Sequence, residues 1–217
     1  MLAVVNRLRT LRPDRPVQAE LQTRGPTVLS GYPSGARRLA LRALQQAGVA
    51  VRTGTRWTTG SAPACDLLLW AAGAQAHAWQ RTPQRRGRLA VSPEGFVQID
   101  GCLRSVSHPR VFAVGDCAHW QQPLPKAGVY AVRMGPVLLD NLLASLQGTA
   151  LRAYAPQTRF LSLLATADGR AIATRGRFSL SGRWAWRWKD RIDRAFMARY
   201  TPPPTAPRAD HAQPQPR

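Results

Sequence analysis

Gly115 and Asp116 are the residues whose types and order most clearly suggest chemistry, because they directly follow the short apolar run Val111–Val114. A carboxylate only accepts hydrogen bonds. At the carboxyl end of a buried parallel strand it therefore suits a ligand that offers hydroxyl groups, and Gly115 lets the backbone approach that ligand closely. Gly-Asp could equally begin a turn or cap the next helix, and the residue types alone leave both readings open.

The elements that would position this pair alternate between strand and helix in the first third of the chain, which predicts an α/β fold. Leu2 to Leu8 has helical spacing, Val17 to Leu21 and Thr27 to Leu29 are β-prone, and a helix is expected from an N-cap at Ser34 to Gly48. Val49 to Gly54 then predicts a strand. Asp66–Gly73 is a continuous apolar run, typical of a strand buried on both faces of a parallel sheet.

The remaining chain predicts two further groups of elements. The first consists of a loop at Arg81–Arg88, a half-buried strand at Phe96–Asp100, a buried strand at Val111–Val114, and a helix from Ala127 to Leu146 that Pro136 bends and Gly148 closes. The second is a small antiparallel unit after Phe160, followed by an amphipathic helix over Trp184–Tyr200. Residues 201–217 are rich in Pro, Ala, Gln and Arg, which predicts a disordered tail.

Arg110–Ala118 resembles the second FAD-binding motif of the glutathione-reductase-like flavoproteins, whose aspartate contacts the ribityl hydroxyls of the flavin. Asp66–Gly73 resembles the strand and Ala-Thr-Gly turn that leaves their NAD(P)-binding domain, with Ala72 at the place of the usual threonine. The resemblance implies an incomplete fold of this kind with a small C-terminal α+β segment. It also implies that Gly73, Gly115 and Asp116 contact cofactor.

A closer resemblance lies in residues 125–133, 135–138, 141–142 and 186–197. These segments are similar to the bacterial NADH-dehydrogenase-like flavoproteins that are often associated with, or fused ahead of, selenide, water dikinase. The resemblance implies hydride transfer from NAD(P)H to FAD and on to an acceptor such as a quinone. It also implies that selenide, water dikinase is a candidate partner.

Lys126, Ala127 and Gly128 complete the candidate cofactor-binding residues. The helix expected to begin there offers free N–H groups and a positive dipole end, which suits the partial negative charge of a reduced flavin's pyrimidine edge. Lys126 would add a full charge, although it could also be an ordinary solvated side chain. Cys117 is expected to be a small buried residue rather than a redox thiol, and the sequence indicates neither catalytic residues nor a metal site.

The glycine pattern limits what this chain is expected to do alone. Each of the two dinucleotide sites of such a flavoprotein needs a Gly-x-Gly-x-x-Gly turn, and no two glycines here are separated by a single residue. We therefore expect an N-terminally truncated fragment that is not active alone, with weak or no retention of FAD; the alternatives are a non-catalytic interaction module and half of a split flavoprotein. The expected domains are 1–80 (remnant of the NAD(P)-binding domain), 81–150 (C-terminal part of the FAD-binding domain), 151–200 (hairpin and helix) and 201–217 (tail).

Composition adds limits on partners. The formal net charge of +20 comes almost entirely from arginines scattered along the chain, so nucleic-acid binding is not expected. No run approaches the length of a membrane span. Peripheral contact of residues 183–199 with a membrane surface stays an alternative to simple packing. The three widely spaced cysteines fit a reduced, cytoplasmic setting.

Overall fold

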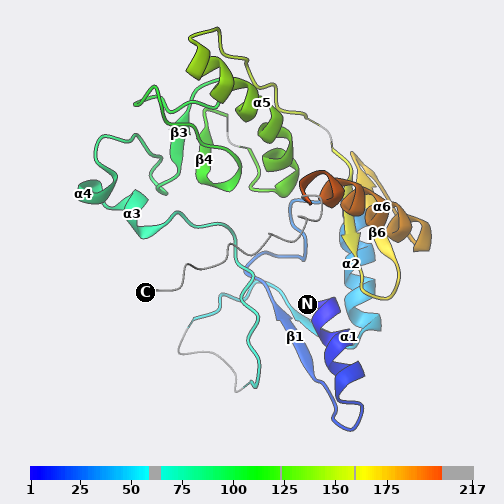
Figure 1. Cartoon of the computed structure of the whole chain (residues 1–217). Coiled ribbons are helices and arrows are strands. Elements are labelled where there is room, and N and C mark those ends of the chain that lie inside the picture. Colours follow the sequence, from blue (N-terminus) through cyan, green and yellow to red (C-terminus); the bar gives the residue numbers. More distant parts are fainter. Residues whose placement is uncertain (59–64, 123, 159, 202–217) are drawn as a thin grey trace, which may run out of the picture. The chain divides into compact units, whose positions relative to one another are not determined.

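A computed structural model describes residues 1–58, 65–122, 124–158 and 160–201 of the chain (Figure 1). The chain divides into two compact units. The first combines Met1–Cys65 with Leu161–Arg217, and the second is Asp66–Phe160. The assignment of residues 1–80 and 81–150 to particular cofactor domains stays a prediction.

The N-terminal part of the first unit is a strand–helix–strand arrangement preceded by a helix. Its elements are α1 (Leu2–Leu11), β1 (Ala19–Gln22), α2 (Ser34–Gln46) and β2 (Val49–Arg52). β1 and β2 pair in parallel, from Ala19 opposite Val49 to Gln22 opposite Arg52. Parallel neighbours need a crossover, and α2 lies in it. A small core of Val5, Val28, Leu44 and Val49 holds these elements together, so the α/β class is confirmed.

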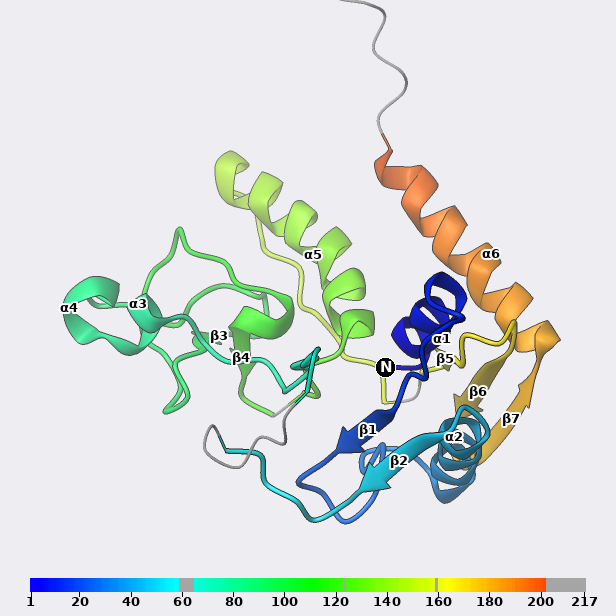
Figure 2. The same cartoon turned by 90° about the horizontal axis from the view of Figure 1, so that it is seen from below.

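The C-terminal part of the first unit is an antiparallel sheet followed by a long helix (Figure 2). Strands β5 (Ser162–Ala165), β6 (Ala171–Arg175) and β7 (Phe178–Gly182) lie in chain order, and α6 (Arg183–Tyr200) packs on β6. α2 contacts both β6 and β7. The approach is close, since a Cβ atom on Gly35 would lie 3.2 Å from the Cβ of Ser179. The predicted antiparallel unit and C-terminal helix are therefore confirmed.

The second unit is built around a parallel strand pair and one long helix. It contains α3 (Ala78–Arg81), α4 (Pro83–Arg86), β3 (Val97–Ile99), the 3-10 turn η2 (Gly115–Cys117), β4 (Ala118–Trp120) and α5 (Gly128–Gln147). β3 pairs with β4 in parallel. Its core consists of the buried residues Val97, Ile99, Leu103, Ala113, Ala118, Met134, Val137 and Tyr154.

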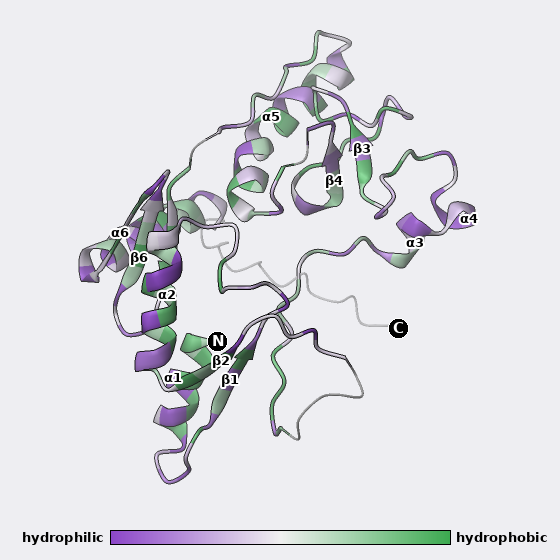
Figure 3. Cartoon of the chain, turned by 180° about the vertical axis from the view of Figure 1, so that it is seen from behind, coloured by the Kyte–Doolittle hydropathy of each residue, from purple (hydrophilic) through white to green (hydrophobic). Residues whose placement is uncertain are grey.

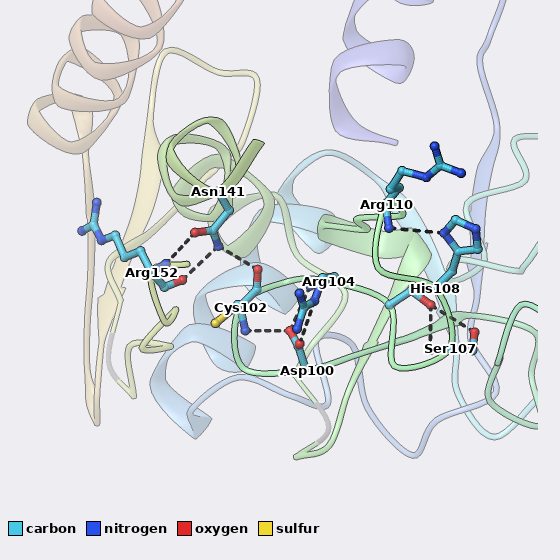
Figure 4. A network of polar contacts seen from close by, with 9 residues as sticks. Asp100, Cys102, Arg104, Ser107, His108, Arg110, Asn141 and Arg152 are labelled. Carbon is cyan, nitrogen blue, oxygen red and sulfur yellow. Dashed lines mark hydrogen bonds and ion pairs between the residues drawn. The ribbon is translucent and has the colours of Figure 1, made fainter. Parts of the chain in front are cut away.

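Asn141 ties α5 to two backbone segments of this unit (Figure 4). It is fully buried, and its Nδ2 donates to the carbonyl oxygens of Cys102 (2.7 Å) and Arg152 (2.9 Å). Its Oδ1 accepts from the backbone N–H of Arg152 (2.7 Å). α5 agrees with the predicted helix to within one residue at each end, and Gly148 closes it in the left-handed conformation at φ 68°.

The prediction of a buried strand at Asp66–Gly73 is wrong. The segment has no regular structure, and Leu67, Leu68 and Leu69 are exposed at 56%, 52% and 45%. A strand buried on both faces requires hydrogen-bonded neighbours on either side. Among the described residues no strand pairs with this segment, so its apolar side chains face solvent.

Four smaller predictions also need correction. Val111–Val114 forms only a single bridge, between Phe112 and Arg104, and of its four residues Ala113 alone is buried. Thr27–Leu29 is a turn in which Leu29 has a φ of 52°. Arg81–Arg88 is not all loop: it contains the last residue of α3 and the whole of the short helix α4, which Pro83 at the first helical turn favours. Pro33 rather than Ser34 is the N-cap of α2.

The predicted tail at 201–217 lies almost wholly outside the described residues.

Candidate functional site

Gly115 begins a tight turn that packs directly against α5. Its φ is 63°, which disfavours any residue with a side chain, and a Cβ atom there would lie 3.0 Å from the Cβ of Ala131. Its N–H donates to the Sδ of Met134 at 3.2 Å. Conformation and space therefore both favour glycine at this position, and the turn packs beside the first half of α5.

Asp116 projects its carboxylate from this turn into solvent. The residue is exposed, and with the described residues its side chain makes no hydrogen bond or ion pair. An ionised carboxylate keeps its full acceptor capacity in such a place. It is therefore free to accept hydrogen bonds from a ligand.

Lys126 holds the backbone of the same turn. Its Nζ donates to the carbonyl oxygens of Asp116 (2.9 Å) and Ala118 (2.6 Å), and lies 3.9 Å from the ring centroid of Phe96. Partial burial lowers the pKa of Lys126, against the opposing attraction of Asp116. An ammonium group has three donors, so Lys126 braces the turn with two of them and retains one.

The N-terminus of α5 lies beside the turn, because Ala131 in its first turns contacts Gly115. Ala127 is the N-cap and provides no side-chain cap. Within the described part of the chain, the N–H groups of Gly128 and Val129 have no acceptor, as is usual at an uncapped helix start. These donors and the positive end of the helix favour a negatively polarised group.

The structure thus brings five of the six predicted residues together: Gly115, Asp116, Lys126, Ala127 and Gly128. Gly73 is different. It lies in the irregular segment after Leu67–Leu69, and a Cβ atom there would meet no atom within 4 Å. Its role in cofactor binding stays a prediction.

The expectation that Cys117 is buried is wrong. It is exposed, and its thiol donates to the carbonyl oxygen of Val114 at 3.1 Å. The 3-10 turn of residues 115–117 directs the Cys117 side chain outward. A strand that continued through this position would instead have buried every second residue.

Two residues that support the site were not recognised from the sequence in that role. The ring of Phe96 makes a cation–π contact with the ammonium group of Lys126. The Sδ of Met134 accepts a hydrogen bond from the N–H of Gly115. Met134 has the spacing of a core-facing helix residue, which indicates burial but not the partner. Nothing in the sequence indicates the pairing of Phe96 with a lysine 30 positions away.

No group of three or more His, Cys, Asp or Glu side chains among the described residues is arranged to hold a metal ion. Likewise, none of the described helices is long and apolar enough to cross a membrane.

The arrangement fits one side of a flavin. A free carboxylate suits the ribityl hydroxyls, the glycine at 115 leaves room for close approach, and the uncapped helix start suits the electron-rich ring edge. The fit covers that side alone, since no Gly-x-Gly-x-x-Gly turn for a pyrophosphate occurs in the sequence.

Comparison with known proteins gives an independent result. The family model described as pyridine nucleotide-disulphide oxidoreductase matches residues 15–135, more than half of the chain. Among solved structures, the sulfide:quinone oxidoreductase from Aquifex aeolicus is similar at a TM-score of 0.68 and 14% identity, over 91% of this chain and 53% of that one.

Two more solved structures are similar. NDH2 from Plasmodium falciparum in complex with NADH matches with a TM-score of 0.67 and 11% identity, over 90% of this chain and 58% of that one. An FAD-dependent pyridine nucleotide-disulphide oxidoreductase from Desulfovibrio vulgaris matches with a TM-score of 0.56 and 19% identity, over 77% and 45%. At these identities the likeness shows the fold, and the chain spans about half the length of these proteins.

Proposed function

Because the chain belongs to the pyridine nucleotide-disulphide oxidoreductase family, we propose that its turn at Gly115–Cys117 and the start of α5 form the ribityl-contacting side of an FAD site. The whole enzyme would transfer hydride from NAD(P)H to FAD and on to an acceptor. The observation that carries the proposal is the free carboxylate of Asp116 on a turn that Gly115, Lys126 and α5 hold in place.

The proposed roles follow from the geometry of each residue. Asp116 accepts hydrogen bonds from ribityl hydroxyls, and Lys126 keeps the Asp116 backbone in place through its carbonyl oxygen. The N–H groups of Gly128 and Val129, which have no acceptor among the described residues, would favour the negatively polarised edge of the ring. FAD, when bound, supplies the redox chemistry, and these residues bind and orient it.

The pyrophosphate and adenosine side requires residues that this sequence does not contain. We propose that the 217-residue chain by itself retains FAD weakly or not at all, and that it acts as one part of a larger or split flavoprotein. Its visible spectrum after purification checks this, because a stoichiometric flavin peak would contradict it.

The acceptor and partners are also proposals. Structural similarity to a sulfide:quinone oxidoreductase supports a quinone as acceptor. Residues 125–133, 135–138, 141–142 and 186–197 support association with selenide, water dikinase through the resemblance described above. The three widely spaced cysteines support a cytoplasmic location.

The ribityl proposal is testable on the chain as it exists, by using riboflavin. Riboflavin carries the ring and ribityl chain but no phosphate, so the arginines of this highly basic protein do not attract it through charge. In a titration followed by 1H–15N NMR, we expect chemical-shift changes at Gly115–Cys117 and Gly128–Val129. The dissociation constant for riboflavin should be on the order of millimolar. Asp116→Asn should weaken binding by about three- to tenfold, as expected for one or two charge-assisted hydrogen bonds.

Asp140→Asn is the matched control, because Asp140 is also an exposed aspartate of the same unit and pairs only with Arg152. It should leave the titration unchanged. If riboflavin perturbed residues away from the turn, or if Asp116→Asn bound as well as the original, the proposed site would be rejected.

A further inference from the structure

Strand β7 forms an outer edge of the antiparallel sheet in the first unit (Figure 2). Its pairing with β6 runs without a bulge from Phe178 opposite Arg175 to Gly182 opposite Ala171. The strand contains neither proline nor a charged residue, which are features that commonly protect an edge from pairing with another strand. β7 can therefore accept a further strand.

The backbone groups along this edge are unpaired. Arg175 and Phe178 close a two-residue turn, so they form a hydrogen-bonded pair, and bonded and non-bonded pairs alternate from there. The N–H and C=O groups of Ser179 and Ser181 consequently point away from β6. No other segment bonds them in the part of the chain that the structure describes. Each of these serines thus offers one donor and one acceptor to a neighbouring strand.

The two faces of β7 differ in polarity. Phe178 and Leu180 lie on one face and are exposed at 79% and 65%. Ser179 and Ser181 lie on the opposite face, where Ser179 closely approaches Gly35 of α2. A strand added beside β7 alternates in the same way, so every second side chain extends the apolar face and the others lie on the serine face.

The serine face borders a groove of about 270 Å³ between β7, α2 and the β5–β6 turn. Arg42 of α2 and Arg170 of the turn line it and are exposed, and Figure 3 shows hydrophilic bands along α2. Among the described residues, neither guanidinium group has an ion pair or a hydrogen bond. Asp168 also lines the groove, but its Oδ1 accepts from the Thr166 hydroxyl (2.5 Å) and the Arg170 N–H (3.1 Å) within the turn. Positive charge is therefore in excess there.

We propose that the edge of β7 is a docking site for an extended segment of a partner polypeptide in which acidic and apolar residues alternate. The segment adds to the sheet as an antiparallel strand. Hydrogen bonds to the backbone of Ser179 and Ser181 supply affinity, and the side chains select the sequence. The carboxylates lie over the groove near its two arginines, and the apolar side chains extend the apolar face of β7.

A second copy of this chain does not fit the same edge. Pairing two β7 strands would place serines over each groove and leave Arg42 and Arg170 without an acidic partner. It would also bring together two chains that each have a formal net charge of +20. An acidic strand is attracted instead. The site belongs to the first unit, and the proposal does not depend on the flavin site of the second.

A titration of the 217-residue chain with a capped heptapeptide tests the proposal. Glutamate and valine alternate in this peptide, with glutamate at both ends. At physiological salt we expect 1H–15N NMR chemical-shift changes centred on Ser179–Ser181. The control is a peptide of the same composition in which all glutamates precede all valines. It has the same charge without the alternation and should bind about tenfold more weakly or worse.

N-methylated peptides test the strand pairing. In an antiparallel addition, the glutamates share the serine face, so their N–H groups point at β7 and those of the valines point away. A methyl group on the nitrogen of an inner glutamate should weaken binding by about tenfold or more, because it removes a hydrogen bond and separates the strands. The same group on the neighbouring valine should change binding by less than about threefold.

Variants of the two groove arginines test the charge selection. Arg42→Gln and Arg170→Gln should each weaken binding of the alternating peptide by about two- to fivefold, as expected for partly exposed ion pairs. Arg38→Gln is the matched control, because Arg38 is an exposed arginine of α2 that does not line the groove. It removes the same charge and should change the affinity by less than about 1.5-fold. Circular dichroism checks that each variant is folded.

The possible results lead to different conclusions. Binding that requires the alternation, the glutamate N–H groups and the two groove arginines supports the proposed site. Equal binding of the control peptide would show attraction by net charge alone and would overturn the proposal. Chemical-shift changes confined to other parts of the chain, or no binding of the alternating peptide, would overturn it as well.

Discussion

Gly115 and Ala131 approach each other so closely that a Cβ atom on residue 115 would lie 3.0 Å from the Cβ of Ala131. The turn that carries Asp116 is therefore set directly by its contact with α5. Any change that widens this contact must move the carboxylate.

Replacing Gly115 by alanine should destabilise the chain by about 1–3 kcal/mol. The new side chain combines a strained φ of 63° with a tight 3.0 Å contact to the Cβ of Ala131, which must move by a few tenths of an ångström to accommodate it. Urea unfolding followed by circular dichroism measures the change. Gly101→Ala is the control, since Gly101 has no positive φ and no atom within 4 Å of an added Cβ, and its effect should stay within about 0.5 kcal/mol.

Lys126→Met should cost about 1–3 kcal/mol of unfolding free energy. The variant keeps the apolar stem but loses hydrogen bonds to two carbonyl oxygens and the contact with the Phe96 ring. Lys189→Met provides the comparison, because Lys189 forms only an exposed helix ion pair with Asp193, worth about 0.3–0.5 kcal/mol. Equal losses in the two variants would show that the bracing role of Lys126 is wrong.

Tyr154→Phe should leave stability unchanged or raise it by about 1 kcal/mol at neutral pH. The Tyr154 hydroxyl is buried and has no hydrogen-bond partner among the described residues, so its removal eliminates a desolvated polar group. A clear loss of stability in urea unfolding would indicate that the hydroxyl does have a partner.

The same variant gives a test of pH dependence. Burial raises the pKa of the Tyr154 hydroxyl above its ordinary value of 10.0, with a further contribution from Tyr130. The folded state then holds a proton that the unfolded state releases, so this contribution to stability is present below pH 10 and is lost as pH rises through the folded pKa. The original chain should lose stability more steeply above pH 10 than Tyr154→Phe.

Asn141→Ala should cost about 2–4 kcal/mol. It leaves the carbonyl oxygens of Cys102 and Arg152 and the N–H of Arg152 without their partner in a fully buried place. Ser145→Ala on the exposed side of the same helix should change stability by less than about 0.5 kcal/mol. Thermal unfolding of the original chain and both variants measures these two losses of stability.

The sequence predicted the elements whose signals are local. α5 and α6 follow from helical periodicity, and the glycine at 148 marks the end of α5 in the left-handed conformation. The parallel pair of β1 and β2 follows from two short apolar runs separated by a helix. Gly115, Lys126 and Gly128, chosen as candidates from two separate segments and the expected helix start, lie close together in the structure.

Predictions failed where structure depends on neighbours far away in the sequence. Asp66–Gly73 and Val111–Val114 both have the composition of buried strands, yet composition does not provide the adjacent strands that such segments need. The same holds for Cys117, whose exposure depends on the 3-10 turn. The contact of Lys126 with Phe96 depends on tertiary packing that no local pattern specifies.

Leu67, Leu68 and Leu69 have a further consequence, for handling the protein in solution. Their backbone groups have no hydrogen-bond partner among the described residues. Such an exposed apolar stretch is a template for intermolecular β-pairing. The high positive charge keeps molecules apart at low ionic strength and loses that effect as salt is added. The protein should therefore be most soluble in buffers of low salt concentration. As salt is added, precipitation should begin with contacts between these leucines of different molecules.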